Sequence, residues 1–252
     1  MRGYTTWMIA TVSFVLATVP TAPAAAENIL EQMEQTLFPD NYRMRMSMVT
    51  REAGGREREM ELTVLYRRGV GSYMEIESPP RSRGTRFLQR EETLWMFIPR
   101  SNSRSAIRLS SRDSFQGSVF SNRDVGESMY TQDYRARVLT TEHIDHPELG
   151  RVEVHQVEAT PQRDVAAYGR ILFTVTVDGS IPLRMQYFAR SGVQTKEMHL
   201  SDIRTFAGRR RPLHMEMVSL EEEGKVSIVR ILELEEDSGM PDRFFTQSHL
   251  TR

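Results

Sequence analysis

Apolar and polar residues alternate along most of this chain from residue 43 onward. Arg43–Thr50 places Met44, Met46 and Met48 on one side and arginine or serine on the other. A period of two is that of a strand with one buried face. The pattern recurs around Phe87 and in short runs at 58–66, 70–76, 93–98, 106–109, 134–140, 151–159, 170–177, 183–189, 195–206, 213–220 and 225–234. Turn residues bound these runs, so we predict roughly eleven to thirteen antiparallel strands joined by hairpins.

Three segments break the alternation. Asn28–Leu37 has apolar residues at helical spacing and predicts a helix, which Phe38-Pro39 ends. Pro241–Leu250 predicts a short closing helix. Ser110–Gln132 is rich in Ser, Asp, Asn and Gly without a period, and predicts a long surface loop that serves as a gate or docking element. No helix separates successive strands, so the pattern indicates a mainly β single domain and not a parallel α/β sheet.

The first 26 residues have the layout of an export signal. Arg2 precedes the apolar run Trp7–Val19, prolines break that run, and Ala24-Ala25-Ala26 offers a cleavage site. The run is short for a membrane span, which favours a cleavable signal peptide over a retained anchor. We therefore expect an exported protein whose mature domain covers residues 27–252.

Composition and motifs argue against several function classes. The chain has no cysteine, which excludes a lipid-modified cysteine and a thiolate metal site. It has 33 basic and 34 acidic residues, and removal of Arg2 leaves 32 and 34, a balance that argues against nucleic-acid binding. We find no nucleophile, zinc-protease, dinucleotide or phosphate-loop motif, so we expect no enzyme and no cofactor. His143 and His146 flank Asp145 in a predicted turn without a third ligand, so we expect no metal site.

Methionine supplies the first candidate site. The chain has 15 methionines, and several fall on the same side of predicted strands. Methionine is flexible and polarisable, which suits a cavity that adapts to its ligand, although a plain core face explains the same pattern. The candidate cavity residues are Met44, Met46, Met48, Met60, Leu62, Val64, Met74, Ile76 and Phe87, with Trp95 and Phe97 expected at a rim.

Arginine supplies the second candidate site. Arg100, Arg104, Arg108 and Arg112 recur every four residues, which places them on one side of a strand. Such a row could contact lipid headgroups or an acidic partner. It equally fits a solvated strand face that prevents edge-to-edge pairing.

The order of short motifs resembles that of a known family. Leu94–Pro99 precedes an arginine-rich strand, followed by Gly117–Asp124, then Asp133-Tyr134, and finally Gly239–Thr246. Over nearly the whole mature chain this order is similar to the LolA-like outer membrane lipoprotein-sorting protein family. The resemblance implies a single curved antiparallel sheet, an incomplete half-open β-barrel, whose apolar concave face is covered by helices. The long Ser110–Gln132 segment departs from the dedicated lipoprotein chaperone, so another lipid fits as cargo equally well.

The resemblance and the methionine face together predict a function. We expect a periplasmic, monomeric, non-enzymatic carrier that binds acyl chains of lipoproteins or lipids for transfer towards the outer membrane. An inner-membrane transporter or an outer-membrane acceptor would be its protein partner. The alternative is an envelope accessory module that docks on a transporter, protease or sensor protein and carries no lipid.

Overall fold

The computed structural model describes residues 23–252 except 102–104, 127–129, 207 and 237–238, with the backbone alone at 23–25 and 126. The strands are β1 (Asn41–Arg51), β2 (Glu57–Arg67), β3 (Gly71–Ser78), β4 (Arg86–Arg90), β5 (Thr93–Phe97), β6 (Ile107–Leu109), β7 (Tyr134–His146), β8 (Gly150–Pro161), β9 (Arg170–Thr176), β10 (Pro182–Phe188), β11 (Gln194–Phe206), β12 (Arg209–Ser219) and β13 (Val226–Glu236). The helices are α1 (Pro23–Leu37), α2 (Asn122–Gly126), α3 (Tyr130–Asp133) and α4 (Gln247–Leu250), with 3-10 turns η1 (Phe115–Gly117) and η2 (Asp242–Phe245).

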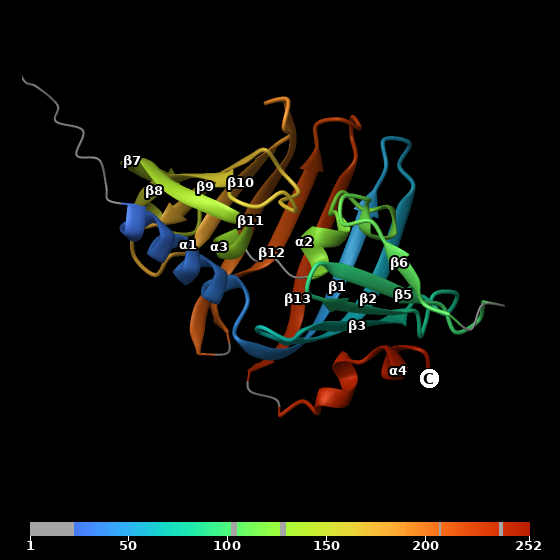
Figure 1. Cartoon of the computed structure of the whole chain (residues 1–252). Coiled ribbons are helices and arrows are strands. Elements are labelled where there is room, and N and C mark those ends of the chain that lie inside the picture. Colours follow the sequence, from blue (N-terminus) through green and yellow to red (C-terminus); the bar gives the residue numbers. More distant parts are fainter. Residues whose placement is uncertain (1–22, 102–104, 127–129, 207, 237–238) are drawn as a thin grey trace, which may run out of the picture.

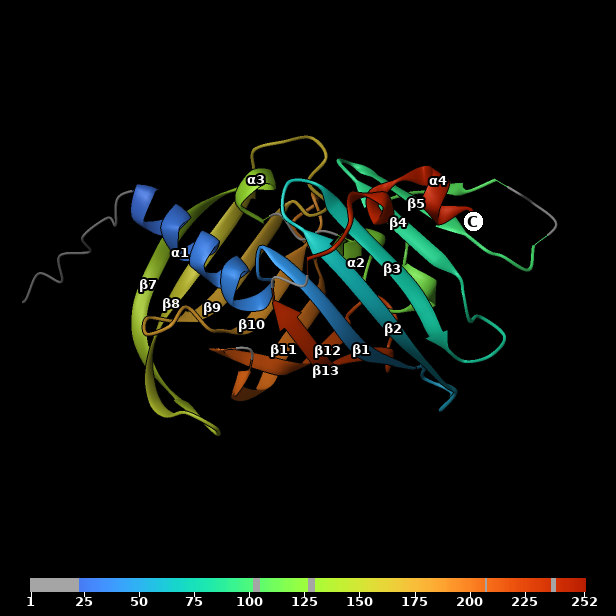
Figure 2. The same ribbon diagram turned by 90° about the horizontal axis from the view of Figure 1, so that it is seen from below.

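All 13 described strands form one antiparallel sheet. Its order is β6-β5-β4-β3-β2-β1-β13-β12-β11-β10-β9-β8-β7, so each strand pairs with its chain neighbour except where β1 meets β13 at the centre. The two edge strands, β6 and β7, are consecutive in the chain. The connection between them must therefore pass from one edge of the curved sheet to the other, and Figures 1 and 2 show it running across the sheet's inner side through α2.

Alternation along the central strands produces the apolar concave face. Met44 and Met48 on β1 pair with Val64 and Met60 on β2, and residues paired across a sheet share one face. These side chains join the largest hydrophobic cluster, together with Leu30 of α1. The fold class predicted from the pattern and the resemblance is confirmed: a mainly β, open, curved sheet with covering helices.

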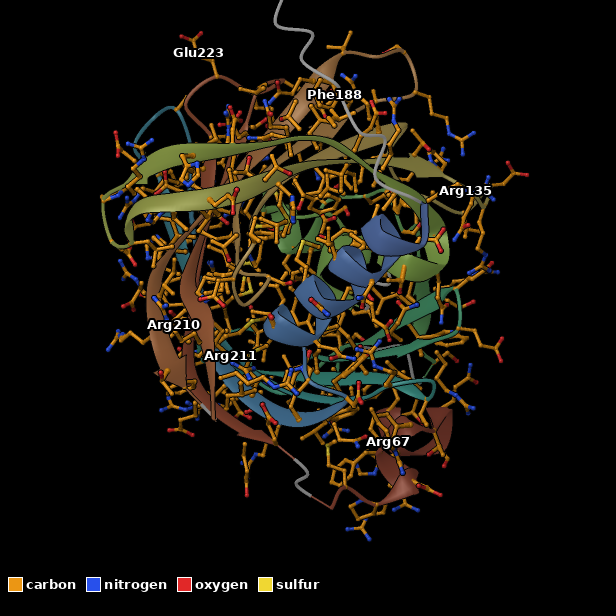
Figure 3. All side chains as sticks on the ribbon, turned by 90° about the vertical axis from the view of Figure 1, so that its left-hand side faces the viewer. Arg67, Arg135, Phe188, Arg210, Arg211 and Glu223 are labelled. Carbon is orange, nitrogen blue, oxygen red and sulfur yellow. The ribbon has the colours of Figure 1, made fainter. Side chains whose placement is uncertain are left out.

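Two elements cover the sheet from opposite sides. Helix α1 contacts β7, β12 and α3, and Figure 3 shows it lying across one end of the curved sheet. The C-terminal segment packs on the outer face, where Phe245 and Leu250 contact Leu88 and Phe97. In Figure 2 α4 lies beside β4. Among the described residues, no helix combines the length and apolar character needed to cross a membrane.

Three boundaries differ from the sequence-based expectations. Helix α1 begins at Pro23 and not at Asn28, because three alanines, the best helix formers, follow the proline. Strand β7 continues to His146, so the histidines expected in a turn lie in a strand. The tail forms η2 and α4 in place of one helix. Most of the predicted signal peptide, residues 1–22, lies outside the described residues.

Gly71 at the start of β3 provides a test of the sheet's packing. It has φ +138°, and a Cβ there would lie 2.0 Å from the carbonyl oxygen of Gln89. We expect Gly71→Ala to lower the free energy of unfolding by about 3 kcal/mol or more, since both the backbone and its neighbour must shift. Gly54→Ala is the control, because a Cβ at Gly54 meets nothing within 4 Å. Urea unfolding of both variants checks this, and equal stabilities would contradict it.

Candidate functional site

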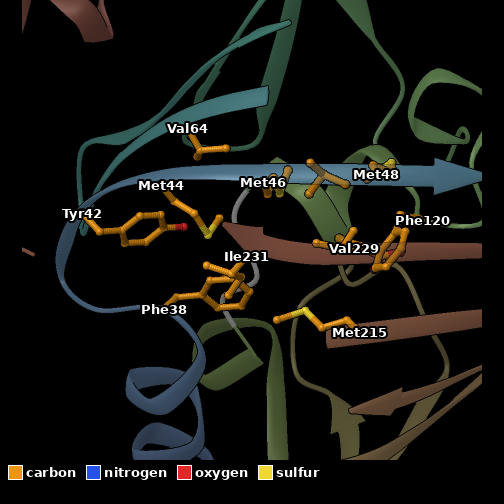
Figure 4. A pocket seen from close by; sticks show the side chains of 12 residues that line it. Phe38, Tyr42, Met44, Met46, Met48, Val64, Phe120, Met215, Val229 and Ile231 are labelled. Atoms are coloured by element: carbon orange, nitrogen blue, oxygen red, sulfur yellow. The ribbon is translucent and has the colours of Figure 1, made fainter. Parts of the chain in front are cut away.

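An apolar pocket lies on the concave face. Figure 4 shows Met44, Met46 and Met48 along β1, with Phe38 at one end and Phe120 at the other. The remaining lining residues are Tyr42, Val64, Asp124, Val125, Met215, Val229 and Ile231. The pocket encloses about 50 Å³. Pockets that hold drug-sized ligands measure about 300–1,000 Å³, so this one admits no acyl chain unless something moves.

The segment that joins the two edge strands fills part of the concave face. We call residues Ser110–Gly126 the crossing segment. Phe115 is fully buried, with its ring centroid 5.0 Å from that of Phe87 on β4. The Val119 amide donates a hydrogen bond of 2.9 Å to Ser227 Oγ on β13. Phe120 contributes to the pocket wall. The crossing segment therefore places its own apolar side chains where a ligand chain would lie.

A polar cluster ties the crossing segment to the far half of the sheet. Tyr168, in the loop between β8 and β9, donates hydrogen bonds of 2.9 and 2.8 Å to the Asp124 carboxylate of α2. Lys196 on β11 donates to the same carboxylate at 3.3 Å and to the Tyr168 hydroxyl at 3.0 Å. Burial and the nearby Asp124 charge raise the pKa of Tyr168 well above its usual value. Asp124 is thus both a wall of the pocket and the partner of a cation.

A second polar contact joins α1 to α3. The buried Glu34 carboxylate accepts hydrogen bonds of 2.9 Å from the Thr131 amide and 2.7 Å from its hydroxyl. Arg68 lies 3.9 Å from the same carboxylate and also bonds to Asp40. Burial raises the pKa of Glu34 from 4.5 to about 7, against the opposing effect of the Thr131 bonds. This carboxyl therefore titrates near neutral pH in the folded protein.

Glu34 makes the stability of the fold depend on pH. Between pH 4.5 and 7 the folded protein holds a proton here that the unfolded chain releases. The resulting stabilisation is complete below pH 4.5 and is lost as pH rises through about 7, a change of about 3 kcal/mol. We expect Glu34→Gln to remove this dependence, so that its stability relative to the wild type increases from pH 4.5 to 8. Urea unfolding across that range measures it, with Glu31→Gln, an exposed acid of α1, as control. Parallel profiles for all three proteins would contradict it.

The structure brings most of the predicted cavity residues together. Met44, Met46, Met48 and Val64 line the pocket itself. The others that pack into the same hydrophobic cluster are Met60, Leu62, Met74, Ile76 and Phe87.

Trp95 and Phe97 lie elsewhere. They pack on the outer face beneath the C-terminal segment, while Leu94 and Met96 of the same strand face the main cluster. The expected rim position is corrected by this placement. Strand β5 is apolar on both faces, so its alternation identifies two sides without showing which one is concave.

The predicted arginine row does not share a single strand face. Arg100 follows β5 in a turn and donates to the Pro80 carbonyl, Arg108 lies in β6, and Arg112 follows β6 in a turn. Arg104 lies outside the described residues. Because β6 has only three residues, a spacing of four cannot be carried along one strand here.

Larger hollows exist, but their walls are charged. One of about 500 Å³ lies on the outer face and includes Glu75, Glu77 and Glu235. Another of about 630 Å³ includes Arg90 and Arg108. An acyl chain in either hollow would bury these charges beside it, so neither hollow suits an acyl chain. Among the described residues, no three of His, Asp and Glu lie close enough together to hold a metal ion.

Sequence reasoning missed Asp124, Tyr168, Lys196 and Glu34. Tyr168 and Lys196 come from different parts of the chain, so no local motif joins them to Asp124. One signal was present: Lys196 and Lys225 are the two lysines in a chain with 33 basic residues. A residue type this rare, on an alternating strand, indicates that its side chain makes a specific contact.

The same fold occurs in several solved structures. A LolA superfamily protein from Nitrosomonas europaea is 24% identical, with a TM-score of 0.78 over 89% of this chain and 99% of that one. An outer membrane lipoprotein-sorting protein domain from Vibrio parahaemolyticus is 20% identical, with a TM-score of 0.76 over 92% and 100%. A DUF1329 family protein from Desulfovibrio piger is 20% identical, with a TM-score of 0.77 over 91% and 100%. At these identities the likeness shows the fold.

Comparison with sequence families adds one match. A family described as "Uncharacterized protein" matches residues 69–252, well over half of the chain. No curated protein matches the sequence.

Proposed function

The chain belongs to the family described as "Uncharacterized protein", its fold is that of the LolA-like outer membrane lipoprotein-sorting proteins, and from this premise we propose that it is a non-enzymatic periplasmic carrier of acyl chains. The observation that carries the proposal is the methionine-lined concave face, covered by the crossing segment, which packs on the sheet without being one of its strands. The acyl chain, of a lipid or a lipoprotein, occupies this face when the crossing segment moves aside.

The free energies involved permit such an exchange. Moving Phe115, Val119 and Phe120 off the sheet exposes three apolar side chains, at about 1.5–3 kcal/mol each. A bound chain of about 14 methylenes recovers about 0.8 kcal/mol for each one, or about 11 kcal/mol in total. Burial of the chain therefore offsets the exposure of these three side chains. The methionines help because flexible side chains can repack around chains of different shape.

The alternative proposal is an accessory module that docks on an envelope protein and carries no lipid. The observation that favours it is the small volume of the pocket, about 50 Å³. Unlike the carrier, an accessory module is expected to bind no lipid under any condition.

Titration with a fluorescent fatty acid distinguishes the two. We expect 11-(dansylamino)undecanoic acid to bind the mature protein at a single site, with a blue shift and enhanced emission. Met48, fully buried on the concave face, supplies the variant: Met48→Asp places a charge where the chain lies and should abolish binding. Val193→Asp is the control because Val193 is 62% exposed on a turn. Circular dichroism confirms that each variant folds. Wild-type protein that binds no probe would exclude the carrier.

A further inference from the structure

Lys196 and Tyr168 present hydrogen-bond donors to the interior of the sheet. Lys196 pairs in register with Tyr187 on β10, a fully buried member of the main cluster, so its side chain starts from the concave face. The Lys196 side chain is 15% exposed, and its ammonium lies 3.0 Å from the Tyr168 hydroxyl. A lysine this close to a hydroxyl in a nearly dry setting forms a strong donor pair for an anion.

The anion that now occupies this position belongs to the crossing segment. The Asp124 side chain is 8% exposed and accepts from both Tyr168 and Lys196. Asp124 also lines the apolar pocket, so its carboxylate stands at the boundary between the methionine face and the donor pair. The Asp124 carboxylate lies beside the apolar pocket as the carboxylate of a fatty acid lies beside its own acyl chain.

Movement of the crossing segment would leave the donor pair without this carboxylate. A buried ammonium is costly without a counter-ion, so opening is more favourable when another anion takes the vacated place. Resting on the function proposed above, we propose that Lys196 and Tyr168 form the headgroup site of the carrier, and that its preferred cargo is a lipid with an anionic carboxylate or phosphate headgroup. Asp124 acts as an internal substitute for that headgroup in the closed protein.

Three lipids with the same chain test this assignment: palmitate, hexadecyl phosphate and methyl palmitate, each measured by displacement of the dansyl fatty acid at pH 8.5. A hydrogen bond to a charged group predicts that the better of the two anions binds on the order of 10- to 100-fold more tightly than the ester. Comparison of palmitate with hexadecyl phosphate identifies the headgroup. Equal affinities for all three lipids would overturn the headgroup site while leaving the carrier intact. If the dansyl fatty acid itself does not bind, both proposals fail.

Single substitutions test which residues cause the preference for anionic lipids. Lys196→Met keeps the length and removes the charge, and should reduce the ratio of anion to ester affinity to about one. Lys225→Met is the matched control, since the other lysine bonds to Glu222 at a hairpin tip and should leave the ratio unchanged. Tyr168→Phe, which keeps the buried ring, should lower the same ratio and serves if Lys196→Met does not fold. Asp124→Asn removes the competing charge and should raise the ratio. An unchanged ratio in Lys196→Met, or in Tyr168→Phe where that variant replaces it, overturns the proposal.

Discussion

A disulfide between Val119→Cys and Ser227→Cys should abolish acyl-chain binding, and reduction should restore it. The Val119 amide lies 2.9 Å from Ser227 Oγ, which places the two Cα atoms within about 7 Å, near the upper limit for a disulfide. The crosslink holds the crossing segment on β13. With about 50 Å³ left beneath it, the concave face cannot accept a chain, so we expect at least about a 100-fold loss of affinity.

The protein is well suited to this experiment because it has no native cysteine. The two single-cysteine variants control for the loss of the Ser227 hydroxyl, which also bonds to Thr50. The reduced double variant controls for the substitutions themselves. If the oxidised and reduced forms bind the dansyl fatty acid equally, the segment does not have to move and the proposed route into the protein is wrong.

Phe120→Ala should increase acyl-chain affinity by about 10- to 100-fold. Phe120 is 5% exposed and forms one end of the pocket, so its removal enlarges the space and weakens the hold of the crossing segment. Opening then becomes easier by about 1.5–3 kcal/mol, and about 1.4 kcal/mol corresponds to tenfold in affinity. Displacement titration measures the change.

Phe173→Ala provides the contrast. Phe173 is fully buried on β9 and belongs to the sheet rather than to the crossing segment. Its replacement should cost about 3–5 kcal/mol of stability. It should bring no gain in affinity. Equal effects of the two substitutions on affinity would show that the crossing segment is ordinary core.

The sequence allowed much of the fold to be predicted because burial alternates along most strands. The positions of Met44, Met46 and Met48 follow directly from a period of two, and the structure places all three in the pocket. The pairing of β1 with β13 could not be predicted, because hairpin signals join only neighbouring strands. Trp95 was expected at a cavity rim and packs on the outer face; β5 is apolar on both sides, and the tail that covers Trp95 is distant in the chain.

The candidate site, like the fold, could be predicted only in part. Its apolar wall was predictable from residue types at a regular spacing. Its polar end was not, because Asp124, Tyr168 and Lys196 meet only after three separate segments fold together. The long crossing segment was recognisable as an exception to the pattern. The surface position expected for Ser110–Gln132 is wrong, because Phe115, Val119 and Phe120 of this segment are buried in the main hydrophobic cluster.

Native mass spectrometry of the protein purified from its own host without detergent tests the carrier proposal most directly. The account predicts a species heavier than the polypeptide by the mass of one lipid, and an organic extract that contains that lipid. If the protein carries only its own mass and its extract contains no lipid, then it is not an acyl-chain carrier.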